Sequence, residues 1–501
     1  MNISGKLKER LDTGVVGFPT ALASSVGVIL ASPVILTVTT GFGLGGGMFA
    51  IAMAIALIMM LAQSATFAEA MSILPTSGSV YDYISCGLGR FAAITGTIAA
   101  YFLVHVFAGT AETILSGIMA TVNFEALQAV LDKTNTAWLV GVGLILTFGI
   151  VNYFGINAFS RAEVFLTGFM WSTLLIFSLI GIFSVPLVDL DGIYGKVPGV
   201  DPGNIVSFIG MAMFMFVGCE LVTPMAPEMR KAARNIPLGM AIGLCLVALL
   251  MFLYGAALSR QVVNVAMKPE GAVRILETPY AIPAFASRVL GAIGKVWIGI
   301  GFLFTGAACL NTLMAALPRI FYGMALDGAL PKAFAYLHPR YKTPVVGILV
   351  AVTVPCLHAW YLKGDQDKIM NLVLAAVCSW GVAYLLVTLS VVSLRIRRPD
   401  IPRAFRSPFF PIPQIISSAG IILGIRYITP PGMNSRDVYL PFLAMLGMVA
   451  FYALIWSTFK MRANPFKPVA VEEILHREFG KQQTAAAEPR GAGPSSPSSV
   501  F

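Results

Sequence analysis

Long apolar runs separated by short polar gaps extend along the chain from residue 15 to residue 459. The hydrocarbon core of a bilayer is about 30 Å thick, and a helix needs roughly 20 apolar residues to cross it. In lipid such a run must be helical, because every backbone N–H and C=O needs a partner within the protein. The pattern predicts twelve membrane-spanning helices, at residues 15–40, 48–74, 92–121, 137–155, 162–188, 204–227, 236–259, 292–320, 344–362, 368–394, 411–428 and 437–459.

Composition supports this interpretation and excludes two others. Of the 501 residues, 57% are hydrophobic and 12% are charged, and the mean hydropathy is +0.81. About 25% of the residues of an average soluble domain are charged, so this chain has too few charges to cover a water-soluble globule of its length. Intrinsic disorder is also excluded, because it requires low hydrophobicity and high charge. The expected fold class is an all-α membrane protein.

The formal net charge is +10, from 34 Lys and Arg against 24 Asp and Glu. These cations lie in the gaps between apolar runs, whereas a nucleic-acid-binding protein gathers them on one face among aromatic residues. We therefore expect no nucleic-acid partner. With the N-terminus in the cytoplasm, roughly two-thirds of the cations fall in cytoplasmic segments, as the positive-inside rule requires. The pattern predicts a multi-pass protein of the cytoplasmic (inner) membrane with both termini in the cytoplasm.

The segments outside the spans follow from this orientation. Residues 1–14 would be a cytoplasmic N-terminus and residues 189–203 an outer loop. Residues 395–462 would hold a cytoplasmic loop and the last two spans. The tail, residues 463–501, turns polar and then becomes rich in Ala, Gly, Pro and Ser. Such a composition predicts a flexible cytoplasmic tail.

Two spans contain helix-interrupting residues at matching places. Residues 23–33 read ASSVGVILASP, and residues 214–227 include Gly218 and two prolines. Gly and Pro weaken a helix, and a helix broken near the membrane midplane exposes N–H groups for a carboxylate and C=O groups for cations. Both are the first spans of five-helix halves, at 15–188 and 204–394. This spacing predicts an inverted 5+5 repeat followed by two additional helices. The alternative is that Gly and Pro are simply common in membrane helices.

Three acidic residues, Glu69, Glu112 and Glu220, lie within apolar runs. A charge in the membrane costs at least about 2.5 kcal/mol, so it normally faces a cavity or a partner. Glu220 follows Gly218 by two residues, and it could pair with a substrate ammonium, brace the broken helix or exchange a proton. Glu69 lies near the end of its span and is expected to be structural. Glu112 follows His105 by seven residues, which permits either a proton relay or an ordinary interior histidine.

Other chemistry is not indicated. The six cysteines are scattered without a CxxC pair, and the four histidines lie far apart without metal-ligand spacing. The GxGxxG spelling at residues 41–46 has no strand before it, and no phosphate-binding loop of the GxxxxGK type occurs. No cluster of nucleophile and base lies within the spans. We expect no cofactor, no metal and no enzymatic activity.

Four loop segments resemble signatures of the amino acid–polyamine–organocation transporter superfamily. They occur in the order and between the spans that the superfamily has, and their combination is specific. The first reads TFAEA with LPTSGSVY, the second FVGCE with PEMRK and RNIP, the third PRIFYGMALDGALP with HPRYKTP, and the fourth RRPDIPRAFR; they lie at residues 66–81, 216–237, 318–344 and 397–406.

The resemblance implies a LeuT-like fold, in which the substrate binds between broken helices one and six of two inverted repeats. It implies a cradle for a substrate carboxylate in helix one, an amine site and an aromatic lid in helix six, and lining or gating residues on helices three and ten. The substrate-binding residues would be Ser24, Ser25, Val26, Gly27, Tyr101, Phe214, Phe216, Val217, Gly218 and Ser379. The coupling and gating residues would be Glu220, Glu112 and Trp380.

Two positions depart from the pattern of the superfamily. Helix one has Ser24 and Ser25 where relatives usually have a glycine-rich stretch. Some proton-coupled relatives have a lysine in helix five at the place of a sodium ion, and the span 162–188 contains none. Asn311 and Thr312 could contribute to a sodium site, although such groups more often join helices to each other.

The sequence therefore predicts a secondary active transporter. It would move an amino acid or related amine by alternating access, as a proton symporter or a solute exchanger. Alternatives are a polyamine or ethanolamine permease of the same fold and, from another class, a channel or membrane receptor. The expected partners are the small-molecule substrate and membrane lipid, and the expected state is a monomer or homodimer.

Overall fold

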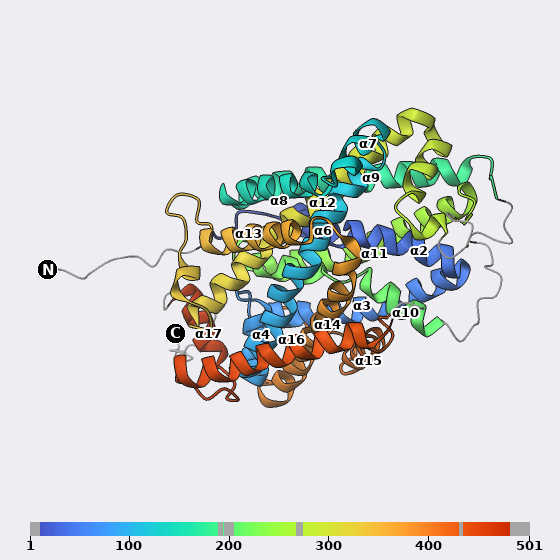
Figure 1. Cartoon of the computed structure of the whole chain (residues 1–501). Helices are drawn as coiled ribbons and strands as arrows, with labels where there is room; N and C mark the ends of the chain where they lie inside the picture. Colours follow the sequence, from blue (N-terminus) through green and yellow to red (C-terminus); the bar gives the residue numbers. More distant parts are fainter. Residues whose placement is uncertain (1–10, 189–193, 195–204, 267–273, 430–433, 481–501) are drawn as a thin grey trace, which may run out of the picture.

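The computed structural model describes residues 11–188, 194, 205–266, 274–429 and 434–480, and in these ranges the protein is helical without a β-strand. Nine of the described helices are long and apolar enough to cross a membrane, and a bent pair, α1 with α2, brings the number to ten. Most of them run along the long axis of the molecule (Figure 1). The predicted all-helical membrane architecture is confirmed at this level.

The first half of the chain begins with the bent pair and ends with a 28-residue helix. The π-helical turns Ile98–Leu103 and His105–Gly109 join α5 to α6, so these segments form one continuous span from Arg90 to Thr121. The helices are α1 Phe18–Ile29, α2 Ser32–Gly45, α3 Gly47–Ile73, α4 Val80–Leu88, α5 Arg90–Thr97, α6 Thr110–Thr121, α7 Glu125–Thr134, α8 Trp138–Tyr153 and α9 Ile156–Phe183.

The second half also begins with an interrupted segment, α10 followed by the 3₁₀ helix η4. The 46-residue α12 bends at Leu290 and Gly291, where the backbone leaves helical geometry. The helices are α10 Ile205–Phe214, η4 Cys219–Glu228, α11 Ala232–Gln261, α12 Ala281–Leu326, α13 Val345–Leu362, α14 Gln366–Arg397, α15 Ile412–Arg426, α16 Arg436–Ile455 and α17 Val471–Phe479.

Helix α1 lies at the centre of the bundle. It packs against α9, α11, α12 and η4, so both halves of the chain contribute to its surroundings. Glycines permit the close approach to α11, because a Cβ on Gly239 would lie 3.0 Å from the Ala21 backbone. The first break in the chain is therefore buried among helices from both halves.

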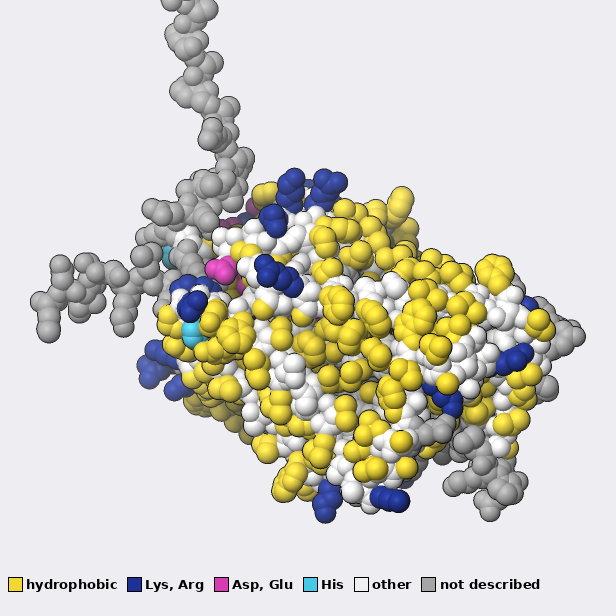
Figure 2. Space-filling view, turned by 90° about the horizontal axis from the view of Figure 1, so that it is seen from above, with side chains coloured by type: hydrophobic (Ala, Val, Ile, Leu, Met, Phe, Trp, Pro, Cys, Tyr) yellow, Lys and Arg dark blue, Asp and Glu magenta, His cyan; other side chains and the backbone are white. Residues whose placement is uncertain are grey.

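The outer surface of the bundle is apolar, as contact with lipid requires. Ile150, Leu349 and Phe451 are 61%, 60% and 67% exposed. Figure 2 shows a wide area of hydrophobic side chains over the middle of one face, with most of the Lys and Arg side chains around its edges. In water this surface would be a severe aggregation hazard.

Part of the segment expected to be a flexible tail is ordered instead. Residues 471–479 form α17, which lies beside α4 at one end of the bundle (Figure 1). The α17 residue Ile474 is fully buried, and the N–H of Val469 donates to the carbonyl oxygen of Ser85 at 3.0 Å. An amphipathic stretch buries its apolar face when a complementary surface is near, and the tail composition did not reveal that surface. Residues 481–501 lie outside the described residues, as do residues 1–10.

Ion pairs connect α17 to two other elements. The Arg477 guanidinium lies 2.5 Å from Asp82 of α4 and 2.5 Å from Asp327, which follows α12. Arg90 pairs with the same Asp327 at 2.9 Å and with Glu473 of α17 at 3.0 Å. Three of these four pairs are largely buried, whereas the Glu473 side chain is exposed. Loss of one partner of a buried pair would leave an uncompensated charge, so the three buried pairs tie α17, α4 and α12 to one another.

This docking should depend on pH through Glu478. Burial, with a further contribution from the Asp82 carboxylate, raises the pKa of Glu478 from 4.5 to about 7, although Arg477 and the Ser77 N–H oppose the shift. The docked helix thus takes up a proton at Glu478, so the contribution of Glu478 to docking is fully present below about pH 4.5 and is lost as the pH rises through 7. Hydrogen exchange of the α17 amides, corrected for intrinsic rates, should show protection falling over this interval.

The Glu478→Gln variant is the matched control, since its amide oxygen can still accept from Ser77 but cannot ionise. Its protection should vary less with pH than that of the unmodified chain. Equal pH dependence in the two proteins would contradict the assignment to Glu478.

Candidate functional site

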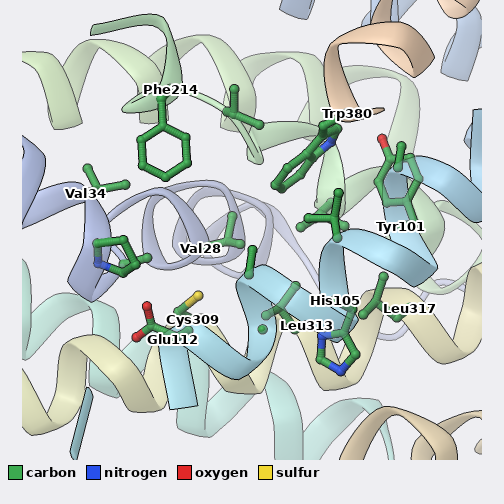
Figure 3. Close-up of a pocket in the computed structure, with 18 residues that line it drawn as sticks. Val28, Val34, Tyr101, His105, Glu112, Phe214, Cys309, Leu313, Leu317 and Trp380 are labelled. Carbon is green, nitrogen blue, oxygen red and sulfur yellow. The ribbon is translucent and has the colours of Figure 1, made fainter. Parts of the chain in front are cut away.

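A buried cavity of about 70 Å³ lies where the two interruptions of the chain meet. Its walls come from α1, α2, the α5–α6 span, the end of α10 and the segments α12 and α14. In Figure 3, Phe214 and Trp380 lie along one side of this space, and Glu112, Cys309 and His105 along the other. Most of the remaining lining is aliphatic, including Val28, Val34, Leu313 and Leu317.

The first interruption separates α1 from α2, whose axes differ in direction by 57°. The N–H of Ser32, the first residue of α2, donates to Glu112 Oε2 at 3.0 Å, and the Ser32 hydroxyl donates to Oε1 at 2.9 Å. Ser32 and Glu112 are both at most 2% exposed. An acidic side chain of the protein itself therefore occupies the positive end of this helix.

The second interruption lies between α10 and η4. The N–H groups of Met215, Phe216 and Val217 each donate a hydrogen bond to the carbonyl group three residues earlier. Gly218 has φ +115°, a conformation that favours glycine, and its N–H donates to the hydroxyl oxygen of Tyr384 at 3.2 Å. The backbone donors released by this break are thus satisfied by neighbours within the protein.

Glu220 is the centre of a buried hydrogen-bond cluster behind the cavity. Its carboxylate accepts from the hydroxyl of Tyr101 at 3.1 Å, from Trp380 Nε1 at 3.0 Å and from the hydroxyl of Tyr384. Tyr384 in turn receives the Gly218 N–H, so one tyrosine joins the helix break to the acid. This cluster links η4 to the third span and to α14, which were predicted to contribute a gate residue and pocket residues.

The structure brings five of the predicted residues to the cavity wall: Tyr101, Glu112, Phe214, Val217 and Trp380. Gly218 and Glu220 lie directly behind them, in the cluster just described. Phe216 is fully buried in the hydrophobic core, and the Ser379 hydroxyl donates within α14 to the Ala375 carbonyl at 3.4 Å.

The four predicted residues of helix one face other helices and do not line this cavity. Ser25 donates to the carbonyl of Cys219 at 3.4 Å, which joins the two interrupted segments. Ser24 is fully buried with no hydrogen-bond partner for its hydroxyl, and Val26 belongs to the core. Gly27 faces α9, and its lack of a side chain makes room for Glu163 and Thr167.

Glu163 is a buried acid that sequence reasoning missed. It is 0% exposed, and it accepts from Asn311 Nδ2 of α12 at 2.7 Å and from the Thr167 hydroxyl at 3.1 Å. The predicted span began at residue 162, which placed this carboxylate at a membrane edge. The helix actually begins at Ile156, so Glu163 lies two turns inside it. The signal available in the sequence was Gly155, because a glycine can mark the boundary of a helix. In the structure Gly155 has a positive φ and directly precedes the helix.

Asn311, considered for a sodium site, is used instead to join helices. Its side-chain oxygen accepts from Asn152 Nδ2 of α8 at 2.9 Å, and its nitrogen donates to Glu163. Within the described ranges no group of three or more His, Cys, Asp or Glu residues is arranged to hold a metal ion.

The sequence of the chain matches a known family model. Residues 16–453 match the model described as "Amino acid permease". Among curated proteins, the chain is similar to the branched-chain amino acid permease BcaP of Bacillus subtilis, with 25% identity over 81% of this chain and 86% of the relative. It is also similar to the serine/threonine exchanger SteT (23%; 79% and 86%) and the methylthioribose transporter (25%; 73% and 77%) of the same organism. These relatives are permeases and transporters, not enzymes.

Two solved structures have a similar fold. One is Mhp1, a nucleobase-cation-symport-1 family transporter in a closed conformation with bromovinylhydantoin bound; its TM-score is 0.53 at 15% identity, covering 95% of this chain and 99% of that one. The other is a Na⁺-coupled sialic acid symporter in a substrate-bound outward-open state, with a TM-score of 0.51 at 14% identity, covering 82% and 89%. At these identities the likeness concerns the fold alone.

Substituting Gly27 by Ala should destabilise the protein. A Cβ there would lie 2.6 Å from Thr167 Oγ1 and even nearer to the Glu163 carboxylate, which Asn311 holds in place. Overpacking of this kind costs about 1–3 kcal/mol, so the melting temperature of the purified protein should fall. Gly168→Ala is the matched control, because its Cβ would meet nothing within 4 Å. Equal melting temperatures for the two variants would refute the packing described for Gly27.

Proposed function

Because the chain belongs to the amino acid permease family, within the amino acid–polyamine–organocation superfamily, we propose that it is a secondary active transporter. It moves an amino acid or related amine across the cytoplasmic membrane by alternating access, as a proton symporter or a solute exchanger. The observation that carries the proposal is the buried cavity between the two interrupted segments, lined by aromatic residues and by Glu112.

The proposed architecture has twelve spans. Nine described helices satisfy the length and hydropathy of a span, the pair α1 and α2 is one bent span, and α8 and α15 are shorter apolar helices that complete the count. Spans one and six are discontinuous, at residues 30–31 and 215–218, and spans one to five and six to ten form inverted repeats. Both termini are in the cytoplasm, and the protein works as a monomer or homodimer.

The proposed route of coupling runs through Glu220. It lies beside the break in helix six, and its hydrogen-bond donors come from two other spans. A change in the charge or position of this carboxylate would therefore alter contacts with Tyr101 and Trp380, two residues of the cavity wall. In this proposal Glu112 is the acidic group inside the cavity, and Glu220 couples the wall to the helix break.

Similar proteins support a small metabolite as substrate but differ in which one. Their names specify branched-chain amino acids, serine and threonine, or methylthioribose. A polyamine or ethanolamine permease of the same fold is a second candidate, which the acidic group in the cavity favours. A channel or receptor is less consistent with a cavity that lies between two different broken helices.

Vesicle transport tests the proposed activity. The purified chain in proteoliposomes should take up labelled small amines or amino acids with saturation, and internal unlabelled solute should accelerate exchange. Uptake that stays linear with concentration would indicate a channel. Specific binding without any flux would indicate a receptor.

Replacing Glu220 by Gln should reduce the initial uptake rate by about tenfold or more. Each charge-assisted hydrogen bond contributes about 1.5–3 kcal/mol, and the neutral amide weakens three of them at once. Tyr384→Phe, which removes one of the three donors, should have a smaller effect. Size-exclusion chromatography checks that both variants fold. Near-normal uptake by a folded Glu220→Gln protein would remove the coupling role.

A further inference from the structure

We propose that the solute is an organic amine without a carboxylate group, and that its ammonium binds Glu112. The inference rests on the proposed transport function and specifies the substrate class of the same cavity. It follows from which hydrogen-bonding groups on the cavity wall are already used and which are free.

The side chains of the wall offer no strong free donor for a carboxylate. Five of its residues have a polar or thiol side chain: Tyr101, His105, Glu112, Cys309 and Trp380; none of the described lining residues is Lys or Arg. The hydroxyl of Tyr101 and the indole N–H of Trp380 both donate to Glu220, behind the wall. Among these side chains, only the weakly donating thiol of Cys309 remains free to donate a hydrogen bond.

Most of the backbone N–H groups at the two interruptions are also occupied. At the start of α2, the Ser32 N–H is bound to Glu112, Pro33 has none, and the Val34 N–H donates to the Ala31 carbonyl. At the second break, the four N–H groups from Met215 to Gly218 all have partners within the protein. At the start of α2 a substrate carboxylate would have to displace Glu112 or lie beside it, against a second negative charge.

Free acceptors, by contrast, are present. Among the described residues Glu112 has no cationic partner, and only Ser32 donates to it, so lone pairs of its two oxygens remain available. His105 Nε2 lies 2.7 Å from the Ala351 carbonyl, to which it must donate, and its Nδ1 is therefore an acceptor. This Nδ1 has no hydrogen-bond partner, although the side chain is only 4% exposed.

A buried carboxylate without a cation is costly, and a ligand ammonium supplies the missing charge. The aromatic residues Phe214, Tyr101 and Trp380 of the wall add faces and edges against which a cation or its alkyl body can pack. The volume of about 70 Å³ corresponds to on the order of five water molecules.

Matched pairs of ligands test the inference on the full chain. Each amino acid is compared with the amine that remains when its carboxylate is removed: valine with isobutylamine, serine with ethanolamine, and alanine with ethylamine. A ligand at free concentration L that binds only the folded protein stabilises it by RT ln(1 + L/Kd), so at equal concentration the tighter ligand raises the melting temperature more. We expect each amine to raise the melting temperature and to inhibit uptake at a concentration at least about tenfold below that of its amino acid.

Three outcomes are distinguishable. Selective stabilisation by the amines supports the inference. Amino acids that stabilise the protein as well as their amines, or better, overturn it while leaving the proposed transport function standing. If no member of any pair binds or is transported, the proposed function fails together with the inference.

Variants at Glu112 locate the effect. Glu112→Gln should weaken amine binding at least about tenfold, and Glu112→Asp, which keeps the charge, should retain most of it. Glu163→Gln removes another buried carboxylate, one that does not line the cavity, and should keep the amine-induced shift. Undiminished amine binding by a folded Glu112→Gln protein would overturn the assignment. The ligand pairs on the unmodified chain decide the question if this variant does not fold.

Discussion

Every backbone N–H and C=O in a lipid environment must find a partner inside the protein, and a helix that breaks there must replace the hydrogen bonds that it gives up. This chain breaks twice, between α1 and α2 and between α10 and η4. Glu112 accepts a hydrogen bond from the Ser32 N–H at the first break, and the Tyr384 hydroxyl accepts one from the Gly218 N–H at the second. These replacement hydrogen bonds hold Glu112 at the cavity wall and bring Tyr384 to Glu220 behind it.

The two breaks are connected through buried side chains. Ser25 of α1 donates to the carbonyl of Cys219 in η4, and Glu220 collects donors from the third span and from α14. A displacement of η4 would therefore change the hydrogen bonds of Tyr101 and Trp380, which line the cavity. In a carrier that alternates between two states, such a cluster gives the binding site and the moving helix a shared set of contacts.

A second set of contacts holds one end of the bundle. Arg477 of α17, together with Arg90, gathers Asp82 and Asp327, which belong to segments far apart in the sequence. Glu69 makes a comparable connection, since its carboxylate accepts hydrogen bonds from Arg395 Nε at 2.7 Å and from the Ser407 N–H at 2.9 Å. Buried acids in this protein thus divide into those paired with arginine at the helix ends and those, such as Glu112, Glu163 and Glu220, bonded only to neutral donors among the described residues.

The sequence alone determined the all-helical membrane architecture, because hydropathy over 20 residues depends on composition and needs no knowledge of neighbours. Loop signatures identified the superfamily, and Gly and Pro in two spans predicted interruptions there. Tertiary structure alone decided which groups each acid meets. Helix one presents Gly27 to Glu163 of α9, and Glu112 reaches the start of α2 across 80 residues of sequence. Helix rotation and helix start set these contacts, and an apolar run leaves both undetermined, since all its faces are equally hydrophobic.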